Sequence, residues 1–299
     1  MATTQTSATA GPAPPRPEPG PLRRILCSID FSEASVAAVA EAVALARACR
    51  GEITVLFVIP YAAPSRGDRP QVPAGVSSAV TEDVEALLEP ARAAGIPVRV
   101  CLKAGRPAHE IIETVRRTAP DVIVMGTHGR GGLKRRVLGS VTTEVLRHAT
   151  CPVLTVGWRR PDPALPAPVR SDAVVCAVGL SPSSPRTLAH ACEVARATGA
   201  GLTLLHVLED RATDMREACR RLHALAAAHG RPEDRIEEVV VPGVPARQIL
   251  RMAAARRAAL VVVGGESLSD RGLSGSTADQ VIRRAPCAVL TARSAPVPA

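Results

Sequence analysis

The chain has 299 residues, a formal net charge of +9 and 46% hydrophobic residues, with only two Phe, one Tyr and one Trp. Its length is sufficient for two domains that each bury a core of their own. The scarcity of rings argues against a protein that binds single-stranded nucleic acid, because such proteins stack bases on aromatic side chains.

The N-terminal segment, residues 1–20, is expected to be a disordered arm. It is rich in Ala, Pro and Thr and lacks the apolar stretch of a secretory signal. No run of about 18 apolar residues occurs in the sequence, so no membrane-spanning helix is expected. The eight cysteines show no C-x-x-C spacing, which favours reduced core residues in a cytoplasmic protein over a zinc site or disulfides.

Apolar runs alternate with Ala-, Leu- and Arg-rich stretches, which is typical of βαβ units with a parallel sheet covered on both faces. The pattern occurs twice, so we expect an α/β fold of two tandem doubly wound domains, each with a five-stranded parallel sheet. The domains are expected over residues 21–158 and 171–295, joined by a Pro-rich linker at 159–170. The expected strands are 23–29, 53–58, 97–102, 121–125 and 152–156 in the first copy, and 173–178, 202–207, 236–241, 259–263 and 287–291 in the second.

The two halves are related by duplication. ILCSIDFSEAS, from Ile25, corresponds to VVCAVGLSPSS, from Val174, and the closing ATCPVLTV corresponds to APCAVLTA. Equivalent residues keep one spacing through the second strand of each copy and a shorter spacing after it. We therefore expect a deletion in the second copy, at the place of the Pro/Gly-rich loop Pro60–Gly75 of the first.

The most informative segment of the first copy follows its fourth strand: Met125–Ser140, MGTHGRGGLKRRVLGS. Its glycines let the main chain approach a ligand closely, and the helix that follows offers free amides and a positive dipole end to an anion. Ser140 can either cap this helix or bond a phosphate oxygen. The segment matches neither a P-loop nor a dinucleotide fingerprint.

Asp30 comes just after the first expected strand. Ligands of doubly wound sheets bind outside the carboxyl ends of the strands, where the direction of the connections reverses. If the first and fourth strands are neighbours at that point, Asp30 faces Gly126 across a crevice. Its carboxylate can then accept hydrogen bonds from a ribose, while the glycine loop takes the phosphates.

Gly126-x-x-Gly129-(nine residues)-Gly139-Ser140 resembles the ATP-binding signature G-2x-G-9x-G-[ST] of the universal stress protein family. ILCSIDFSE resembles that family's opening strand and turn, and LRHATCPVLTV resembles its closing helix and strand. The likeness covers residues 22–157 and 172–292, so it implies a tandem, two-domain member of the family.

The resemblance also implies how the two copies assemble. The family commonly dimerises through its last strand, so Val153–Val156 and Ala288–Ala292 are expected to pair antiparallel within one chain. The chain would then be an intrachain pseudo-dimer, and two apolar strand edges would cover each other.

The resemblance assigns a role to each residue that matches the family pattern. It implies that Asp30 contacts the ribose, that Val58 pairs with adenine through its backbone, and that Met125 packs on the nucleoside. Ile29 stands where the family often has a polar residue, which leaves only its backbone to help. The implied phosphate ligands are Gly126, Gly129, Gly139, Ser140 and the amide of Val141.

The polar and basic loop residues have alternative roles. His128 is either a phosphate contact or a solvent-facing side chain. Arg130 and its basic neighbours either screen a triphosphate or are solvated; these neighbours are Lys134, Arg135 and Arg136.

The second copy departs from the signature, with a shorter loop before Gly275-Ser276 and with Gly179, Glu266 and Ser267 in place of Asp30, His128 and Gly129. The lost carboxylate removes the ribose contact, and the added acid repels phosphates. We therefore expect this copy to be degenerate, with one nucleotide bound per chain.

The expected function is that of an ATP-binding regulatory protein of the stress response, with little or no hydrolysis and with Mg²⁺ carried by the nucleotide. No catalytic or metal-ligating residue is assigned. The alternatives are a nucleotide-independent scaffold or a cyclic AMP reader; a nucleotide hydrolase or nucleotidylyltransferase is disfavoured, because SIDFSEAS carries neither H-x-G-H nor S-G-G-x-D-S. Beside adenine nucleotide, the expected partner is a regulatory protein of unknown identity, and a homodimer of whole chains is left open. Nucleic acid and membranes are not expected partners.

Overall fold

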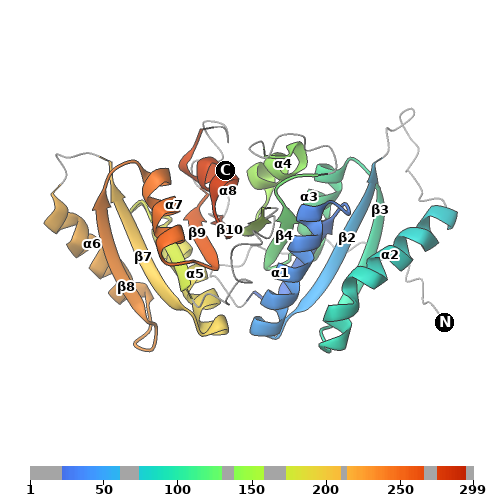
Figure 1. Cartoon of the computed structure of the whole chain (residues 1–299), viewed down its shortest axis with the longest axis horizontal. Coiled ribbons are helices and arrows are strands. Elements are labelled where there is room, and N and C mark those ends of the chain that lie inside the picture. The colour runs from blue at the N-terminus through green and yellow to red at the C-terminus, as the bar shows by residue number, and fades with distance from the viewer. Residues whose placement is uncertain are drawn as a thin grey trace, which may run out of the picture.

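The computed structural model describes residues 22–60, 74–129, 138–157, 173–209, 214–265 and 275–293. They form one continuous ten-stranded sheet with helices on both faces (Figure 1). The elements of the first half are β1 (Arg24–Ile29), α1 (Glu33–Cys49), β2 (Glu52–Pro60), α2 (Ala74–Ala93), β3 (Val98–Gly105), α3 (Pro107–Thr118), β4 (Val122–Gly126), α4 (Ser140–His148) and β5 (Val153–Val156). Those of the second half are β6 (Ala173–Ala177), α5 (Ser184–Thr198), β7 (Gly201–Leu208), α6 (Met215–His229), β8 (Ile236–Pro242), α7 (Pro245–Ala255), β9 (Leu260–Gly264), α8 (Thr277–Arg284) and β10 (Ala288–Ala292).

Both halves have the same doubly wound topology. The strand order is β3-β2-β1-β4-β5 in the first half and β10-β9-β6-β7-β8 in the second, and neighbouring strands within each half are parallel. One hydrophobic cluster packs α1, α2, α5 and α6 against one face of the sheet, and a second packs α3, α4, α7 and α8 against the other. The predicted fold is confirmed, and every expected strand is present with its ends shifted by a few residues at most.

The local sequence explains where the elements form. Central strands are near-continuous apolar runs because both of their faces are covered; in β4, VIVMG, every residue is buried. α1 begins after Ser32, whose side chain accepts a hydrogen bond from the Ser35 amide, and it ends at Arg50, which adopts a left-handed φ of 51°. Pro107 opens α3 at a position where the missing amide hydrogen costs nothing.

The two halves join through their last strands. β5 and β10 pair antiparallel with Leu154 opposite Leu290, and the Thr155 hydroxyl donates a hydrogen bond to the Val289 carbonyl (3.2 Å). The cluster on one face contains Leu154 and Leu290, and the cluster on the other contains Val153 and Val289, so both cross this seam. The implied pseudo-dimer is confirmed. Because the pairing is antiparallel, the carboxyl ends of the strands in the two halves lie at opposite edges of the sheet.

A second contact across the seam involves Arg293, which directly follows β10. Its guanidinium donates hydrogen bonds to the carbonyl oxygens of Leu146 (2.8 Å), Arg147 (2.9 Å) and Ala149 (3.0 Å) at the C-terminus of α4. Terminal carbonyls have no partner inside a helix, and a cation there also complements the helix dipole. The equivalent position in the first copy is Gly157, which has no side chain to return this contact.

The deletion in the second copy is not confined to a loop. α2 has 20 residues and α6 has 15, so part of the shortening falls within the helix that follows the second strand. The prediction that placed the deletion in the loop Pro60–Gly75 is therefore wrong in part. Shortening a surface helix at one end keeps its remaining apolar face on the sheet, which makes the change tolerable.

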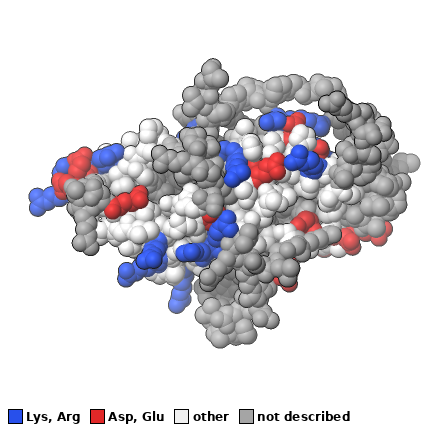
Figure 2. All heavy atoms as spheres, turned by 90° about the horizontal axis from the view of Figure 1, so that it is seen from above, with Lys and Arg blue, Asp and Glu red and all other residues white. Residues whose placement is uncertain are grey.

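The surface properties follow the composition. Among the helices in the described ranges, none has the length and apolar character that crossing a membrane requires. On the face seen in Figure 2, basic and acidic side chains are spread over several elements instead of gathering in one place.

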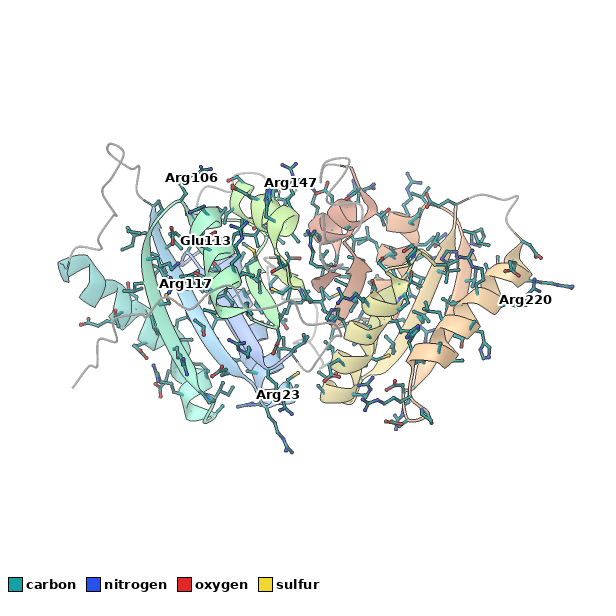
Figure 3. All side chains as sticks on the ribbon, turned by 180° about the vertical axis from the view of Figure 1, so that it is seen from behind. Arg23, Arg106, Glu113, Arg117, Arg147 and Arg220 are labelled. Atoms are coloured by element: carbon teal, nitrogen blue, oxygen red, sulfur yellow. The ribbon has the colours of Figure 1, made fainter. Side chains whose placement is uncertain are left out.

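We expect Arg293→Ala to lower the free energy of unfolding by about 1–3 kcal/mol, because three helix-terminal carbonyl groups lose a charged donor. Arg220→Ala is the matched control, since Arg220 projects from the outer helix α6 (Figure 3) and pairs with Glu217 at the surface. Such a pair is worth about 0–1 kcal/mol. Urea unfolding followed by circular dichroism measures both variants, and equal losses would contradict a specific role for Arg293.

A second stability prediction concerns His190 in α5. Its side chain is 7% exposed, and its Nδ1 has no hydrogen-bond partner among the described residues. Burial, and after it the charge of Arg186, lowers the pKa of His190 from 6.5 to about 4. In the unfolded chain this histidine is protonated below about pH 6.5, whereas in the folded chain it stays neutral until about pH 4. The free energy of unfolding therefore falls as the pH is lowered through this window.

The expected loss across this window is about 1–3 kcal/mol, and it should shrink in His190→Leu. Urea unfolding at a series of pH values within the window measures it. An unchanged pH dependence in the variant would show that other groups cause the loss.

Candidate functional site

The turn after β1 fixes the position of Asp30. Asp30 Oδ1 accepts a hydrogen bond from the Ser32 amide (3.0 Å), and Phe31 between them has a left-handed φ of 61°. A non-glycine residue in this region is uncommon and is held there by its surroundings. The second copy repeats the conformation at Leu180, with a φ of 55°. The turn thus places residue 30 at the carboxyl end of the sheet, between β1 and α1.

Contacts between β1 and β4 bring Asp30 to the glycine loop. The two strands are neighbours, and the Ser32 hydroxyl donates a hydrogen bond to the His128 carbonyl (3.1 Å). Asp30 Oδ2 lies so close to Gly129 that a Cβ on this glycine would be 2.7 Å from it. Asp30 therefore faces Gly129, three residues beyond the Gly126 named in the expectation from the sequence.

Close packing against α1 requires a glycine at position 126. A Cβ at this position would lie 2.9 Å from both the carbonyl carbon and the Cβ of Ala34, at the start of α1. Only a glycine lets β4 approach the helix this closely. Its carbonyl accepts a hydrogen bond from the Thr142 hydroxyl (2.9 Å), which fixes the first turn of α4 against the end of β4. Sequence analysis did not identify Thr142 or Ser32 as positioning residues.

The N-terminus of α4 is open. Its N-cap is Gly139, with φ −60° and ψ 148° and no side-chain cap, and the Gly139 amide donates to the Thr127 carbonyl (2.8 Å). Ser140 is the exposed first residue of the helix and not its cap, so the capping role considered for it is wrong. Val141 follows, half-buried. As far as the described residues go, the amides of the first turn and the positive end of the helix dipole remain available to an anion.

His128 lies between the two halves. Its Nδ1 is 2.7 Å from the Thr127 hydroxyl, and its buried Nε2 has no partner among the described residues. Burial lowers the pKa of His128, and the charge of Arg283 lowers it further. Because Arg283 belongs to α8, the second half contributes to the surroundings of the first half's loop. The side chain is half-buried, which fits a ligand contact better than a solvent-facing histidine.

The apolar residues expected at the site are all buried. Val58 and Met125 are 7% and 4% exposed and belong to the cluster under α3 and α4, whereas Ile29 belongs to the cluster on the other face. Beside the turn, the rings of Phe31 and Phe57 lie 5.1 Å apart. Arg130, Lys134, Arg135 and Arg136 lie outside the described residues.

The second copy closes the corresponding helix terminus with its own side chains. Ser276 is the N-cap of α8, and its hydroxyl accepts a hydrogen bond from the Asp279 amide (3.1 Å). Asp279 returns the contact by accepting from the Gly275 amide (3.1 Å), and its other oxygen binds Arg283 (2.6 Å). This arrangement resembles a capping box, with the carboxylate on the amide before the N-cap, and its S-x-x-D spacing is readable from the sequence. Sequence analysis, which looked for glycines, missed it.

The described residues of the first half fit an anionic ligand with a polar and an apolar part. Uncapped helix amides can bind phosphate oxygens, the carboxylate of Asp30 can accept hydrogen bonds, and His128 Nε2 is a buried polar atom without a partner in the described part of the chain. No group of three or more His, Cys, Asp or Glu side chains in the described ranges is arranged to hold a metal ion.

Comparisons with known proteins agree with this arrangement. The model of the "Universal stress protein family" matches the chain twice, over residues 21–157 and 171–293. A universal stress protein of Methanocaldococcus jannaschii is 30% identical over 138 residues, which cover 45% of this chain and 81% of that protein. One of Mycobacterium tuberculosis is 31% identical over 190 residues, which cover 58% of this chain and 62% of that protein.

A solved structure shares the two-domain arrangement. The crystal structure of a universal stress protein from Archaeoglobus fulgidus DSM 4304 has a TM-score of 0.70 and 26% identity, and the match covers 90% of this chain and 97% of that one. Two family matches, the paired five-stranded halves and this likeness over nearly the whole length lead to one conclusion. The chain belongs to the universal stress protein family, in which it is a tandem member with two domains.

Proposed function

We propose that the first domain binds one adenine nucleotide per chain, and that this binding serves regulation with little or no hydrolysis. The observation that carries the proposal is the difference between the two equivalent helix termini. The first turn of α4 has no side-chain cap, whereas that of α8 is occupied by Ser276 and Asp279. An anion can bind the free amides of α4, and at α8 it would meet a carboxylate.

Each part of a nucleotide has a matching group in the first half. The ribose hydroxyls can donate to the carboxylate of Asp30, which lies against Gly129. The phosphates suit the terminal amides of α4 and the hydroxyl of Ser140. The base suits the apolar surroundings of Val58 and Met125. Bound Mg²⁺ would neutralise part of the phosphate charge.

The described residues favour binding over turnover. Asp30 Oδ1 is engaged by the Ser32 amide, and Nδ1 of His128 is engaged by Thr127. These two hydrogen bonds hold both groups in place as ligand contacts. A protein that holds a nucleotide without consuming it can report the nucleotide level to a partner, which is the regulatory role proposed.

We expect ATP to bind at one site per chain, and Asp30→Ala to weaken it by about 1.5–3 kcal/mol because the ribose loses a charged acceptor. Asp30→Asn should weaken binding less, since its amide oxygen still accepts from Ser32 and preserves the turn. Isothermal titration calorimetry with ATP, AMP and cyclic AMP measures affinity and stoichiometry.

The matched control is Gly179→Ala in the second copy, where an added Cβ has no protein atom within 4 Å. It should leave the affinity for ATP unchanged. A stoichiometry of two sites would contradict the proposal, and so would the absence of heat with all three nucleotides. Preference for cyclic AMP over ATP would identify a cyclic nucleotide reader instead.

A separate prediction uses the N-cap. Gly139→Asp should supply the side-chain cap that α4 lacks, because the backbone of Gly139 is already extended. The new Cβ would lie 3.3 Å from the Thr127 carbonyl oxygen, so the backbone must adjust slightly. The carboxylate would occupy the amides and repel phosphate. We expect at least a tenfold loss of ATP affinity, about 1.4 kcal/mol, with an unchanged or raised melting temperature.

Ser276→Gly is the counterpart in the second copy. It removes the cap of α8 at a cost of a few tenths of a kcal/mol and should not alter ATP binding. If Gly139→Asp bound ATP as tightly as the natural chain, the helix terminus would not be the phosphate site. Thermal unfolding of each variant without nucleotide separates the effect on folding from that on binding.

A further inference from the structure

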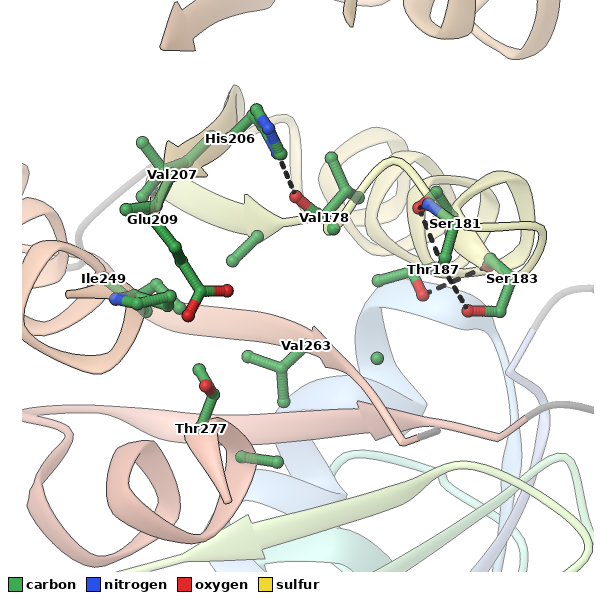
Figure 4. A pocket seen from close by; sticks show the side chains of 17 residues that line it. Val178, Ser181, Ser183, Thr187, His206, Val207, Glu209, Ile249, Val263 and Thr277 are labelled. Carbon is green, nitrogen blue, oxygen red and sulfur yellow. Dashed lines mark hydrogen bonds between the residues drawn. The ribbon is translucent and has the colours of Figure 1, made fainter. Parts of the chain in front are cut away.

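The second half contains a cavity of about 260 Å³ at the carboxyl edge of its strands (Figure 4). It lies between the ends of β6, β7 and β9 and the first turns of α5, α7 and α8. Its apolar lining includes Leu205, Val207, Ile249 and Val263. Val207 and Val263 correspond to Val58 and Met125, so this cavity occupies the place that the proposed nucleotide site has in the first half.

The charge of this cavity is opposite to what a nucleotide needs. Among the described residues that line it there is no Lys or Arg, and Glu209 is the one carboxylate. The Glu209 side chain points toward Val263 and Thr277 (Figure 4), and it forms no hydrogen bond or ion pair with any described residue. The equivalent residue of the first copy is Pro60, so the carboxylate is a feature of the second copy alone.

The remaining polar side chains of the cavity are hydroxyls and the imidazole of His206, whose Nδ1 lies 2.9 Å from the Val178 carbonyl oxygen (Figure 4). At the start of α5, Ser181 Oγ lies 3.2 Å from Ser183 Oγ, and the Thr187 hydroxyl donates to the Ser183 carbonyl. At the opposite wall, Thr277 begins α8, whose N-terminus is closed by Ser276 and Asp279. The Asp279 amide is therefore already bound by Ser276, and a phosphate at this end of α8 would meet the Asp279 carboxylate.

We propose that this cavity binds a small organic cation, a primary amine with an apolar body and a hydroxyl group. The ammonium group pairs with Glu209, the body lies on the apolar lining, and the hydroxyl reaches the serines and Thr187 at the start of α5. The site does not depend on nucleotide binding by the first half. The second copy is then a binding domain whose charge preference has been reversed, and not merely a scaffold.

Three related probes separate the charge from the shape of the ligand. Tyramine carries the ammonium group, tyrosol has a neutral hydroxyl in its place, and 3-(4-hydroxyphenyl)propionate has a carboxylate. Isothermal titration calorimetry on the full chain should show tyramine binding at one site, tyrosol binding more weakly and the propionate not binding. Saturating ATP should not displace tyramine, because the two proposed sites lie at opposite edges of the sheet.

Variants assign the effect to this cavity. Glu209→Gln should weaken tyramine roughly fivefold, the size expected for an exposed ion pair, and leave tyrosol unchanged. Gly179→Leu should weaken both, because Gly179 lines the cavity and an added Cβ has no protein atom within 4 Å. Thermal unfolding checks that both variants fold. Asp30→Ala, in the first half, should leave tyramine binding unchanged.

Several outcomes would overturn the proposal. The propionate binding as tightly as tyramine would show that the cavity does not select a cation. An equal loss of tyramine and tyrosol in Glu209→Gln, or no loss of tyramine, would remove the carboxylate from the site. Displacement of tyramine by ATP would place the amine in the first half, and no heat with tyramine or tyrosol would mean that the cavity does not accept this class of ligand.

Discussion

The antiparallel pairing of β5 with β10 is the contact on which the rest of the molecule depends. Without it, each half would end in a short, mainly apolar strand with unpaired backbone groups, which is a template for aggregation. Pairing satisfies both edges at once and merges the hydrophobic clusters of the two halves on each face of the sheet. It also brings α8 near the loop after β4, where the charge of Arg283 acts on His128. The surroundings of the first site are therefore a product of both copies.

The same fold carries two proposed sites of different charge preference, because only a few residues determine that preference. The strands, the left-handed residue after the first strand and the helix after the fourth are common to both copies. The difference lies in whether side chains occupy the amides at the start of that last helix. In α4 the cap is a glycine and the terminus is open; in α8 a serine and an aspartate close it. Divergence after duplication needed no change of fold.

The architecture was predictable because its signals are local and repeated. Strands such as β4 are uninterrupted apolar runs. Because the sequence is duplicated, each element predicted in one copy could be compared with the equivalent segment of the other copy. The details of the site depend on tertiary geometry that no spacing reveals. Asp30 lies against Gly129, and Gly126 is required by its contact with Ala34. The Arg293 contact joins residues far apart in sequence, so only the folded chain displays it.

That contact has a consequence for how such a protein can evolve. In a dimer of identical chains, symmetry forces every substitution to appear twice, so a bulky or charged residue must be tolerated on both sides of the axis. Here Arg293 supports one helix end, and the equivalent position on the other side is Gly157. Covalent fusion frees the seam from self-complementarity and also prevents exchange of partners. The two halves thus resemble the two different subunits of a heterodimer. Because they belong to one chain, they are always present in a ratio of one to one.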